Sequence, residues 1–166
     1  MKLGFVSDSL GAMSLEDMLD NAARMGVSGV EVNTCGWSTA PHFDLRTMLG
    51  DAGARKAYQT AFADRGLEII SLNANGNPFW TEIASLAREN GVERIALELH
   101  GNQCVYNVPS LRRLREAVGP MIGANLDPSH LFWMGADPLV AAEALGDAIY
   151  HVHAKDTLLN APVQAT

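Results

Sequence analysis

The stretch ANLDPSHLFW, residues 124–133, carries the residue types most suited to chemistry. An apolar run ends on Asp127, and His130 follows three positions later. An aspartate and a histidine at this spacing, at the end of a strand, can hold a metal ion. The same pair is equally typical of a turn with a capping residue. The choice depends on whether other parts of the chain deliver matching groups to the same place.

Four further apolar segments also end in polar residues. Alternate residues of a strand share a face, so each segment pairs polar side chains on one face and aliphatic side chains on the other. The polar pairs are Glu31 and Asn33, Ser71 and Asn73, Glu98 and His100, Asn125 and Asp127, and His151 and His153. Gly123 and Ala96 leave room on the same faces. Parallel α/β proteins build their sites at the carboxyl ends of strands, so we expect these groups to converge.

The residue types favour a site for one divalent metal ion. Glu98, Asp127 and His153 form a mixed oxygen and nitrogen set that suits Mn²⁺, Mg²⁺, Co²⁺ or Zn²⁺. Such an ion can polarise a carbonyl and stabilise an enediolate while a carboxylate moves a proton between adjacent carbons. We expect Pro128 to displace His130 onto a loop, where it adds a ligand or holds a substrate hydroxyl. Each group alone is more often a cap, but the shared face of the set favours a site.

The elements that must position these residues follow one recurring pattern: a helical stretch, a glycine and a short β-rich run. It predicts strands at residues 2–7, 28–33, 67–73, 93–99, 121–126 and 149–154, and helices at 15–25, 53–65, 80–90, 109–118 and 138–146. Ser14 with Asp17, and Asp137 before Pro138, mark two helix starts. Residues 34–53 are predicted to form a long loop. Repeated βα units predict an α/β fold with a parallel sheet, as an open sandwich or a barrel.

Composition narrows the partners and the compartment. The chain has 166 residues, 48% of them apolar and 19% charged, which predicts one globular domain. Its net charge of −7 disfavours nucleic acid as a partner. No apolar run approaches the roughly 18 residues of a membrane span, and no signal peptide is indicated. The two cysteines lie far apart in loop-like contexts, so we expect no disulfide framework and a cytoplasmic protein.

Several motifs resemble the sugar phosphate isomerase/epimerase family, which has a xylose isomerase-like TIM barrel. They are SLEDMLDNAARMGVSGVEVN, ALELHG, NLDPSH and HVHAKD, and LDPSH with HVHAKD is the most specific pair. The resemblance implies one divalent metal bound by a glutamate, an aspartate, a histidine and a final glutamate, with the two glutamates as acid and base. The first three fall on Glu98, Asp127 and His153, which makes Glu98 the predicted catalytic residue. The predicted substrate-binding residues are His130, His100, Asn33, Asn73, Lys155 and Asp156.

The sequence departs from the eight-unit family barrel. It predicts six strands, and the ALELHG strand is fourth here but fifth in the family. We expect one βα unit to be missing around Asn77–Trp80. The chain also stops after HAKDTLLNAPVQAT, before a strand with the final glutamate, so we expect a fragment, an internally deleted form or a reduced homologue. The prediction is a single partial barrel domain, residues 1–166, whose open strand edges favour a homo-oligomer.

Three functions compete at this point. The leading hypothesis is a metal-dependent isomerase or epimerase that transfers a proton next to a carbonyl of a sugar or cyclitol. Without the final glutamate, we expect little turnover from this chain alone, so the second hypothesis is a catalytically impaired remnant that binds a metal, a ligand or a partner chain. The third is an apurinic-site endonuclease. It requires more histidine ligands and a basic groove, which five histidines at a net charge of −7 do not supply.

Overall fold

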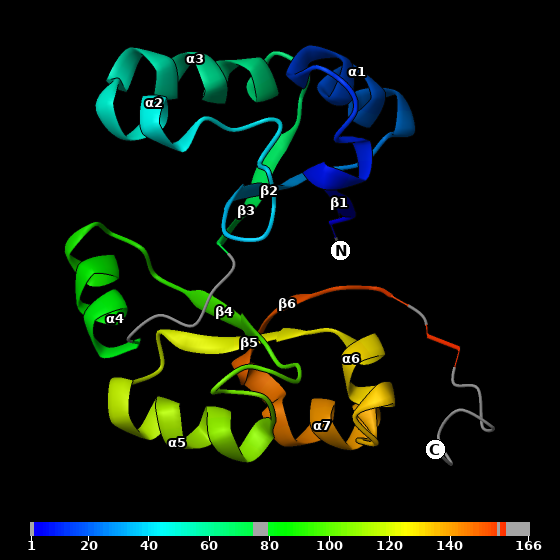
Figure 1. Ribbon diagram of the computed structural model, residues 1–166, viewed down its shortest axis with the longest axis vertical. Coiled ribbons are helices and arrows are strands. Elements are labelled where there is room, and N and C mark those ends of the chain that lie inside the picture. The colour runs from blue at the N-terminus through cyan, green and yellow to red at the C-terminus, as the bar shows by residue number, and fades with distance from the viewer. Residues whose placement is uncertain (1, 75–79, 156, 159–166) are drawn as a thin grey trace. The chain divides into compact units, whose positions relative to one another are not determined.

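The computed structural model describes residues 2–74, 80–155 and 157–158 (Figure 1). The chain divides into two compact units, residues Met1–Gly76 (unit 1) and Asn77–Thr166 (unit 2). The expectation that both belong to one partial barrel domain stays a prediction.

Unit 1 contains a three-stranded parallel sheet in the order β1-β2-β3. Its strands and helices are β1 (Gly4–Val6), α1 (Leu15–Met25), β2 (Gly29–Cys35), α2 (Leu45–Gly50), α3 (Ala52–Ala63) and β3 (Glu68–Ala74), with a 3₁₀ turn at Ser7–Leu10. Helices α1 and α3 lie on the same side of the sheet (Figure 1). Met18 and Leu19 of α1, Val30 and Val32 of β2, and Phe62 of α3 are almost fully buried and form the core.

Helix α1 shows how local sequence sets an element. The Ser14 side chain accepts a hydrogen bond from the Asp17 backbone N–H at 3.1 Å and caps the first turn. Met18 and Ala22, four positions apart, lie on the buried face. Gly26 ends the helix at a φ of 71°, a left-handed conformation that glycine adopts without a steric penalty.

The prediction of a long loop at residues 34–53 is wrong in part, because α2 and the first residues of α3 lie within it. The Asp44 side chain accepts hydrogen bonds from the backbone N–H groups of Arg46 and Thr47 and starts α2. Asp51 caps α3 in the same way.

Unit 2 contains a second three-stranded parallel sheet, in the order β4-β5-β6. Its elements are α4 (Trp80–Glu89), β4 (Ile95–Glu98), α5 (Val108–Val118), β5 (Ile122–Leu126), α6 (Pro128–Trp133), α7 (Pro138–Leu145) and β6 (Ile149–Val152), with a 3₁₀ turn at Gly146–Ala148. Helices α5 and α7 lie side by side along this sheet (Figure 1). The core includes Leu97, Leu111, Ile122, Ala124 and Leu145.

The central strand β5 is buried at all five residues, as expected for a strand with neighbours on both edges. Glu98 of β4 lies opposite Asn125 of β5, so the carboxyl ends of these two strands lie side by side at the same end of the sheet. All described strand pairs are parallel, which confirms the predicted α/β class. Every predicted strand and helix is present, with its ends within two residues of the prediction.

The third strand of each sheet has a register shift. In β6, Ile149 lies opposite Ala124 and His151 opposite Asn125, so Tyr150 is an extra residue. The tyrosine ring fills the space beside Gly123, where an added Cβ would lie 2.3 Å from a ring carbon. The expectation that Gly123 leaves room for the site is therefore wrong. In β3, Ile70 is the corresponding extra residue.

None of the described helices combines the length and the apolar character that a membrane crossing requires.

Candidate metal centre at the end of the unit 2 sheet

Four side chains of unit 2 meet at the carboxyl end of its sheet. Glu98 ends β4, Asp127 follows β5 and His153 follows β6. The backbone N–H of His153 donates to the Leu126 carbonyl at 3.0 Å, which extends the pairing of β6 with β5 to the edge of the site. The fourth group, His130, comes from α6.

The donor atoms of these four residues share one small space. Glu98 Oε1 lies 2.8 Å from His153 Nδ1 and 3.5 Å from His130 Nε2. Asp127 Oδ2 lies 3.6 Å from each of the same two ring nitrogens. Two carboxylates and two imidazoles therefore face one another, as the residue types of the motifs predicted.

Asp127 is held rigidly and is fully buried. Its Oδ1 accepts hydrogen bonds from the Ser129 N–H at 3.0 Å and the Ser129 hydroxyl at 2.6 Å. This leaves Oδ2, which is also buried, turned toward the cluster. Lys155 Nζ lies 2.7 Å from Oδ2. Burial alone would raise the pKa of Asp127, but hydrogen bonds from Lys155 and Ser129 together with the Lys155 charge outweigh it and lower this pKa to about 2.

Lys155 also lies 3.8 Å from Glu98 Oε1, with its own side chain half-exposed. Its ammonium thus compensates the negative charge of both carboxylates. The side chain of Glu98 is 28% exposed, whereas that of Asp127 is 0% exposed. Solvent therefore contacts the Glu98 carboxylate directly, whereas the Asp127 carboxylate is covered by its neighbours, Lys155 among them.

The residues present fit a divalent metal ion. Bonds of about 2.1 Å place adjacent ligand atoms of one ion about 3 Å apart. The distances from His153 Nδ1, 2.8 Å to Glu98 Oε1 and 3.6 Å to Asp127 Oδ2, are close to that spacing. Glu98, Asp127 and His130 form a second set whose donor atoms lie within 4.8 Å of one another. Both sets contain the two carboxylates and differ in the imidazole.

His130 does not lie on a loop, as the sequence had predicted, but in α6. The prediction was wrong because Asp127 caps this helix and Pro128 occupies its first position, where proline needs no hydrogen bond. The ring of His100 lies near that of His130, with the two ring centres 5.0 Å apart. Gln103 Nε2 lies 3.1 Å from His100 Nε2.

Three predicted substrate residues remain. Asn33 and Asn73 belong to unit 1, where Asn73 donates to Glu31 Oε1 at 2.8 Å and the backbone N–H of Asn33 donates to the Ser7 hydroxyl. Asp156 lies outside the described residues. The substrate-binding roles of these residues stay predictions.

Sequence reasoning placed Asn125 on the polar face but gave it no partner, and it missed Ser129 and Trp133. The Asn125 amide lies 3.2 Å from His153 Nδ1, Ser129 holds Asp127, and the Trp133 indole N–H donates to His130 Nδ1 at 3.2 Å. The available signal was positional: a serine two residues after a capping aspartate, and a tryptophan one helical turn after His130.

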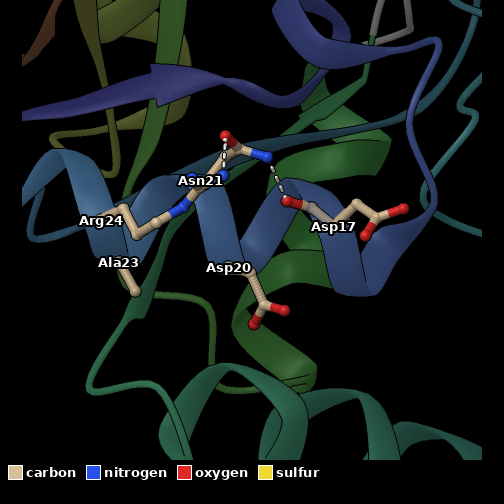
Figure 2. Close-up of a pocket in the computed structure, with 5 residues that line it drawn as sticks. All are labelled: Asp17, Asp20, Asn21, Ala23 and Arg24. Atoms are coloured by element: carbon tan, nitrogen blue, oxygen red, sulfur yellow. Dashed lines mark hydrogen bonds between the residues drawn. The ribbon is translucent and has the colours of Figure 1, made fainter.

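A surface hollow of about 460 Å³ in unit 1 is a weaker candidate (Figure 2). All five of its lining residues come from α1, and the polar ones already have partners, Asp20 pairing with Arg65. Asn21 donates to the Asp17 carbonyl at 2.7 Å, and Arg24 donates to Asn21 Oδ1 at 2.6 Å. Figure 2 shows these side chains spread along one helix, whereas the strand-end cluster draws donors from three strands and a helix.

Comparison with known proteins places a family match on the unit that holds this cluster. Residues 78–162 match the family model described as the xylose isomerase-like TIM barrel. The chain is also 35% identical to the uncharacterized protein YfiH of Bacillus subtilis over 228 residues, covering 94% of this chain and 73% of YfiH. That alignment is longer than the 166 residues of this chain, so parts of YfiH have no counterpart here.

Two solved structures are similar in fold. The probable 3-DHS dehydratase AsbF of Bacillus anthracis, involved in petrobactin synthesis, superposes with a TM-score of 0.64 at 19% identity, covering 92% of this chain and 72% of AsbF. An uncharacterized protein from Parabacteroides distasonis gives a TM-score of 0.59 at 18% identity, covering 99% of this chain and 82% of that protein. At such identities the likeness shows the fold alone.

Proposed function

Because this chain belongs to the xylose isomerase-like TIM-barrel family, we propose that it is a metal-dependent enzyme that moves a proton next to a carbonyl of a sugar or cyclitol. The reaction class is isomerisation or epimerisation. The observation that carries the proposal is the convergence of Glu98, Asp127 and His153, in which His153 Nδ1 lies 2.8 Å from Glu98 Oε1 and 3.6 Å from Asp127 Oδ2. These three residues are the ligands that the family resemblance implies, and their positions support the proposal.

The bound ion would act as a Lewis acid that polarises the substrate carbonyl and lowers the energy of the enediolate. Asp127, Glu98 and His153 would hold it. Asp127 suits the role of a pure ligand, since it is inaccessible to solvent and its lowered pKa keeps it ionised.

Glu98 suits the role of base, because its partly exposed carboxylate can approach a substrate carbon. It would remove the proton beside the carbonyl and, in isomerisation, deliver it to the adjacent carbon on the same face. In epimerisation, a second acid would protonate the same carbon from the opposite face. His130, 22% exposed and facing both carboxylates, is placed to contact a substrate oxygen. Lys155 supports the ionised form of Asp127.

A second candidate reaction is dehydration. The structural neighbour AsbF is described as a dehydratase, and elimination of water next to a carbonyl begins with the same proton removal. The two reactions differ in the product: elimination forms a conjugated double bond that absorbs in the ultraviolet, whereas isomerisation forms none.

The test is incorporation of solvent deuterium into a panel of ketoses and keto-cyclitols, measured by mass spectrometry with Mg²⁺, Mn²⁺ or Co²⁺. We expect metal-dependent exchange that falls about 10²- to 10⁴-fold in Glu98→Gln. Glu89→Gln, the same change at an exposed position of α4, should leave the exchange unchanged.

The outcomes separate the competing functions. Metal binding without exchange in any substrate would favour the impaired remnant over the enzyme. If the chain neither binds a metal nor catalyses exchange, the proposal as a whole is contradicted. Cleavage of DNA at an apurinic site would favour the endonuclease, which the net charge of −7 opposes.

A further inference from the structure

The nitrogen of His130 that points away from the two carboxylates, Nδ1, contacts the side chain of Trp133. His130 and Trp133 lie three positions apart on α6, so their side chains share one face of the helix. The indole Nε1 lies 3.2 Å from His130 Nδ1, with the two rings at 77° to each other and their centres 5.9 Å apart. An indole N–H can only donate a hydrogen bond, so His130 Nδ1 must accept it and carries no hydrogen.

It follows that the neutral ring of His130 carries its hydrogen on Nε2. This atom lies 3.5 Å from Glu98 Oε1 and 3.6 Å from Asp127 Oδ2. Both distances exceed the range of about 2.7–3.2 Å for an N–H···O hydrogen bond. The N–H therefore faces the space between the two carboxylates, close to both and bonded to neither.

A metal-binding histidine has the opposite arrangement. It uses the lone pair of one ring nitrogen for the ion and donates the N–H of the other to a carboxylate or carbonyl. The outer nitrogen of His130 instead faces a donor. We propose that Trp133 is a positioning residue that fixes His130 as the Nε2–H tautomer, so that His130 donates a hydrogen bond to a ligand oxygen and does not bind the metal.

Trp133 is well placed for this task although its side chain is half-exposed. The indole lies against Gly101, just beyond the end of β4, where an added Cβ would be 3.2 Å from the ring carbon Cη2 and 3.5 Å from Cζ3. A side chain at position 101 would force the indole to shift by a few tenths of an ångström. The turn after β4 thus packs against the indole, and the indole orients the imidazole.

The inference deepens the proposed function, since it leaves His153 as the imidazole ligand and gives His130 a hydroxyl or carbonyl oxygen to bind. The tautomer itself exists in the metal-free chain. It is therefore testable whether or not the chain binds a metal.

The experiment is long-range ¹H–¹⁵N correlation NMR on the full-length, metal-free chain with ¹⁵N-labelled histidine and tryptophan. We expect His130 to show a protonated Nε2 and an unprotonated Nδ1, with a through-hydrogen-bond coupling from Trp133 Nε1–H to that Nδ1. Trp133→Phe should convert His130 to a mixture of both tautomers. Trp37→Phe, the same change at an exposed position of unit 1, should leave the His130 signals unchanged.

A second variant reaches the same contact from the other side. Gly101→Ala should push the indole away and weaken the coupling without removing the donor. Addition of Zn²⁺ should shift the His153 nitrogens and leave the Nε2–H of His130 in place.

Protonated Nδ1 in wild-type His130, an unchanged tautomer in Trp133→Phe, or loss of the Nε2–H on addition of Zn²⁺ would each overturn the inference. If Trp133→Phe does not fold, the wild-type tautomer and its coupling to Trp133 decide the question. If Zn²⁺ shifts no histidine, the proposed metal centre fails while the tautomer result stands on its own.

Discussion

Asp127 has two tasks, because one of its carboxylate oxygens caps α6 and the other faces the cluster. The two tasks can be separated by comparison with Asp137, which caps α7 in the same way and is also followed by a proline. Replacing either aspartate by asparagine alters a helix cap, but only the change at Asp127 alters the metal centre.

We therefore expect Mn²⁺ to raise the melting temperature of the wild type and of Asp137→Asn but not of Asp127→Asn. An ion at 100 times its dissociation constant stabilises the folded state by about 2.7 kcal/mol. Thermal unfolding followed by circular dichroism, with and without Mn²⁺, measures the difference. An equal shift in both variants would mean that the ion binds elsewhere.

The lowered pKa of Asp127 predicts a loss of stability in acid. The pKa falls from 3.8 to about 2 on folding, so its contribution is fully present above pH 3.8 and is lost as the pH falls toward 2. The contribution is about 1–2 kcal/mol, discounted because Lys155 is half-exposed.

Lys155→Met should raise the folded-state pKa of Asp127, so the acid loss of stability should begin at a higher pH. Urea unfolding between pH 2 and pH 6 measures it. Lys2→Met, which removes an exposed ion pair with Glu68 in unit 1, serves as the matched control. Identical acid profiles in the two variants would contradict the assigned role of Lys155.

At the residue scale, the sequence predicted which carboxylates and histidines would meet because that depends only on strand alternation and parallel pairing. It did not predict the partners Ser129 and Trp133. Their contacts depend on α6, whose six residues give too short a pattern for helical periodicity.

At the scale of elements, strands and long helices were predictable because their apolar periodicity and caps agree. The short helices α2 and α6 were missed for want of length, although Asp44 and Asp127 marked their starts. The register shifts were missed as well. A bulge changes which side chains share a face without leaving a pattern in the strand itself.

The bulge at Tyr150 leaves no space for a side chain at Gly123. In Gly123→Ala the new methyl group would meet the tyrosine ring at 2.3 Å and the Ala148 carbonyl oxygen at 2.6 Å. We expect a loss of about 1–3 kcal/mol in the free energy of unfolding, as for other overpacked sites. Urea unfolding measures it.

The control is Gly50→Ala, where an added Cβ meets nothing within 4 Å, and it should leave the free energy of unfolding unchanged. Equal stability of the two variants would show that the bulge adapts freely.

At the scale of the whole molecule, the two units have the same plan. Each has three parallel strands in chain order, a bulged third strand, and a second connection made of a short helix followed by a longer one. Each also has its own buried core. The sequence predicts a single domain over residues 1–166. This prediction requires the two cores to unfold together.

Amide hydrogen exchange with a local perturbation measures this. In Gly29→Ala the new Cβ would lie 2.1 Å from the Glu68 carbonyl oxygen, which forces β2 away from β3. We expect exchange to accelerate mainly in the strands of unit 1, and Gly123→Ala to accelerate exchange mainly in unit 2. An equal acceleration in both units would show that residues 1–166 unfold as one cooperative domain.

The separate sheets and cores also bear on how the length of such a chain changes in evolution. The junction between the two units, at Gly76 and Asn77, lies outside every described strand and outside both buried cores. Because the alignment with YfiH is longer than this chain, YfiH contains residues that have no counterpart here. An insertion at this junction would leave every described strand with its present neighbours inside its own sheet, so we expect chain length to change there more readily than within either sheet.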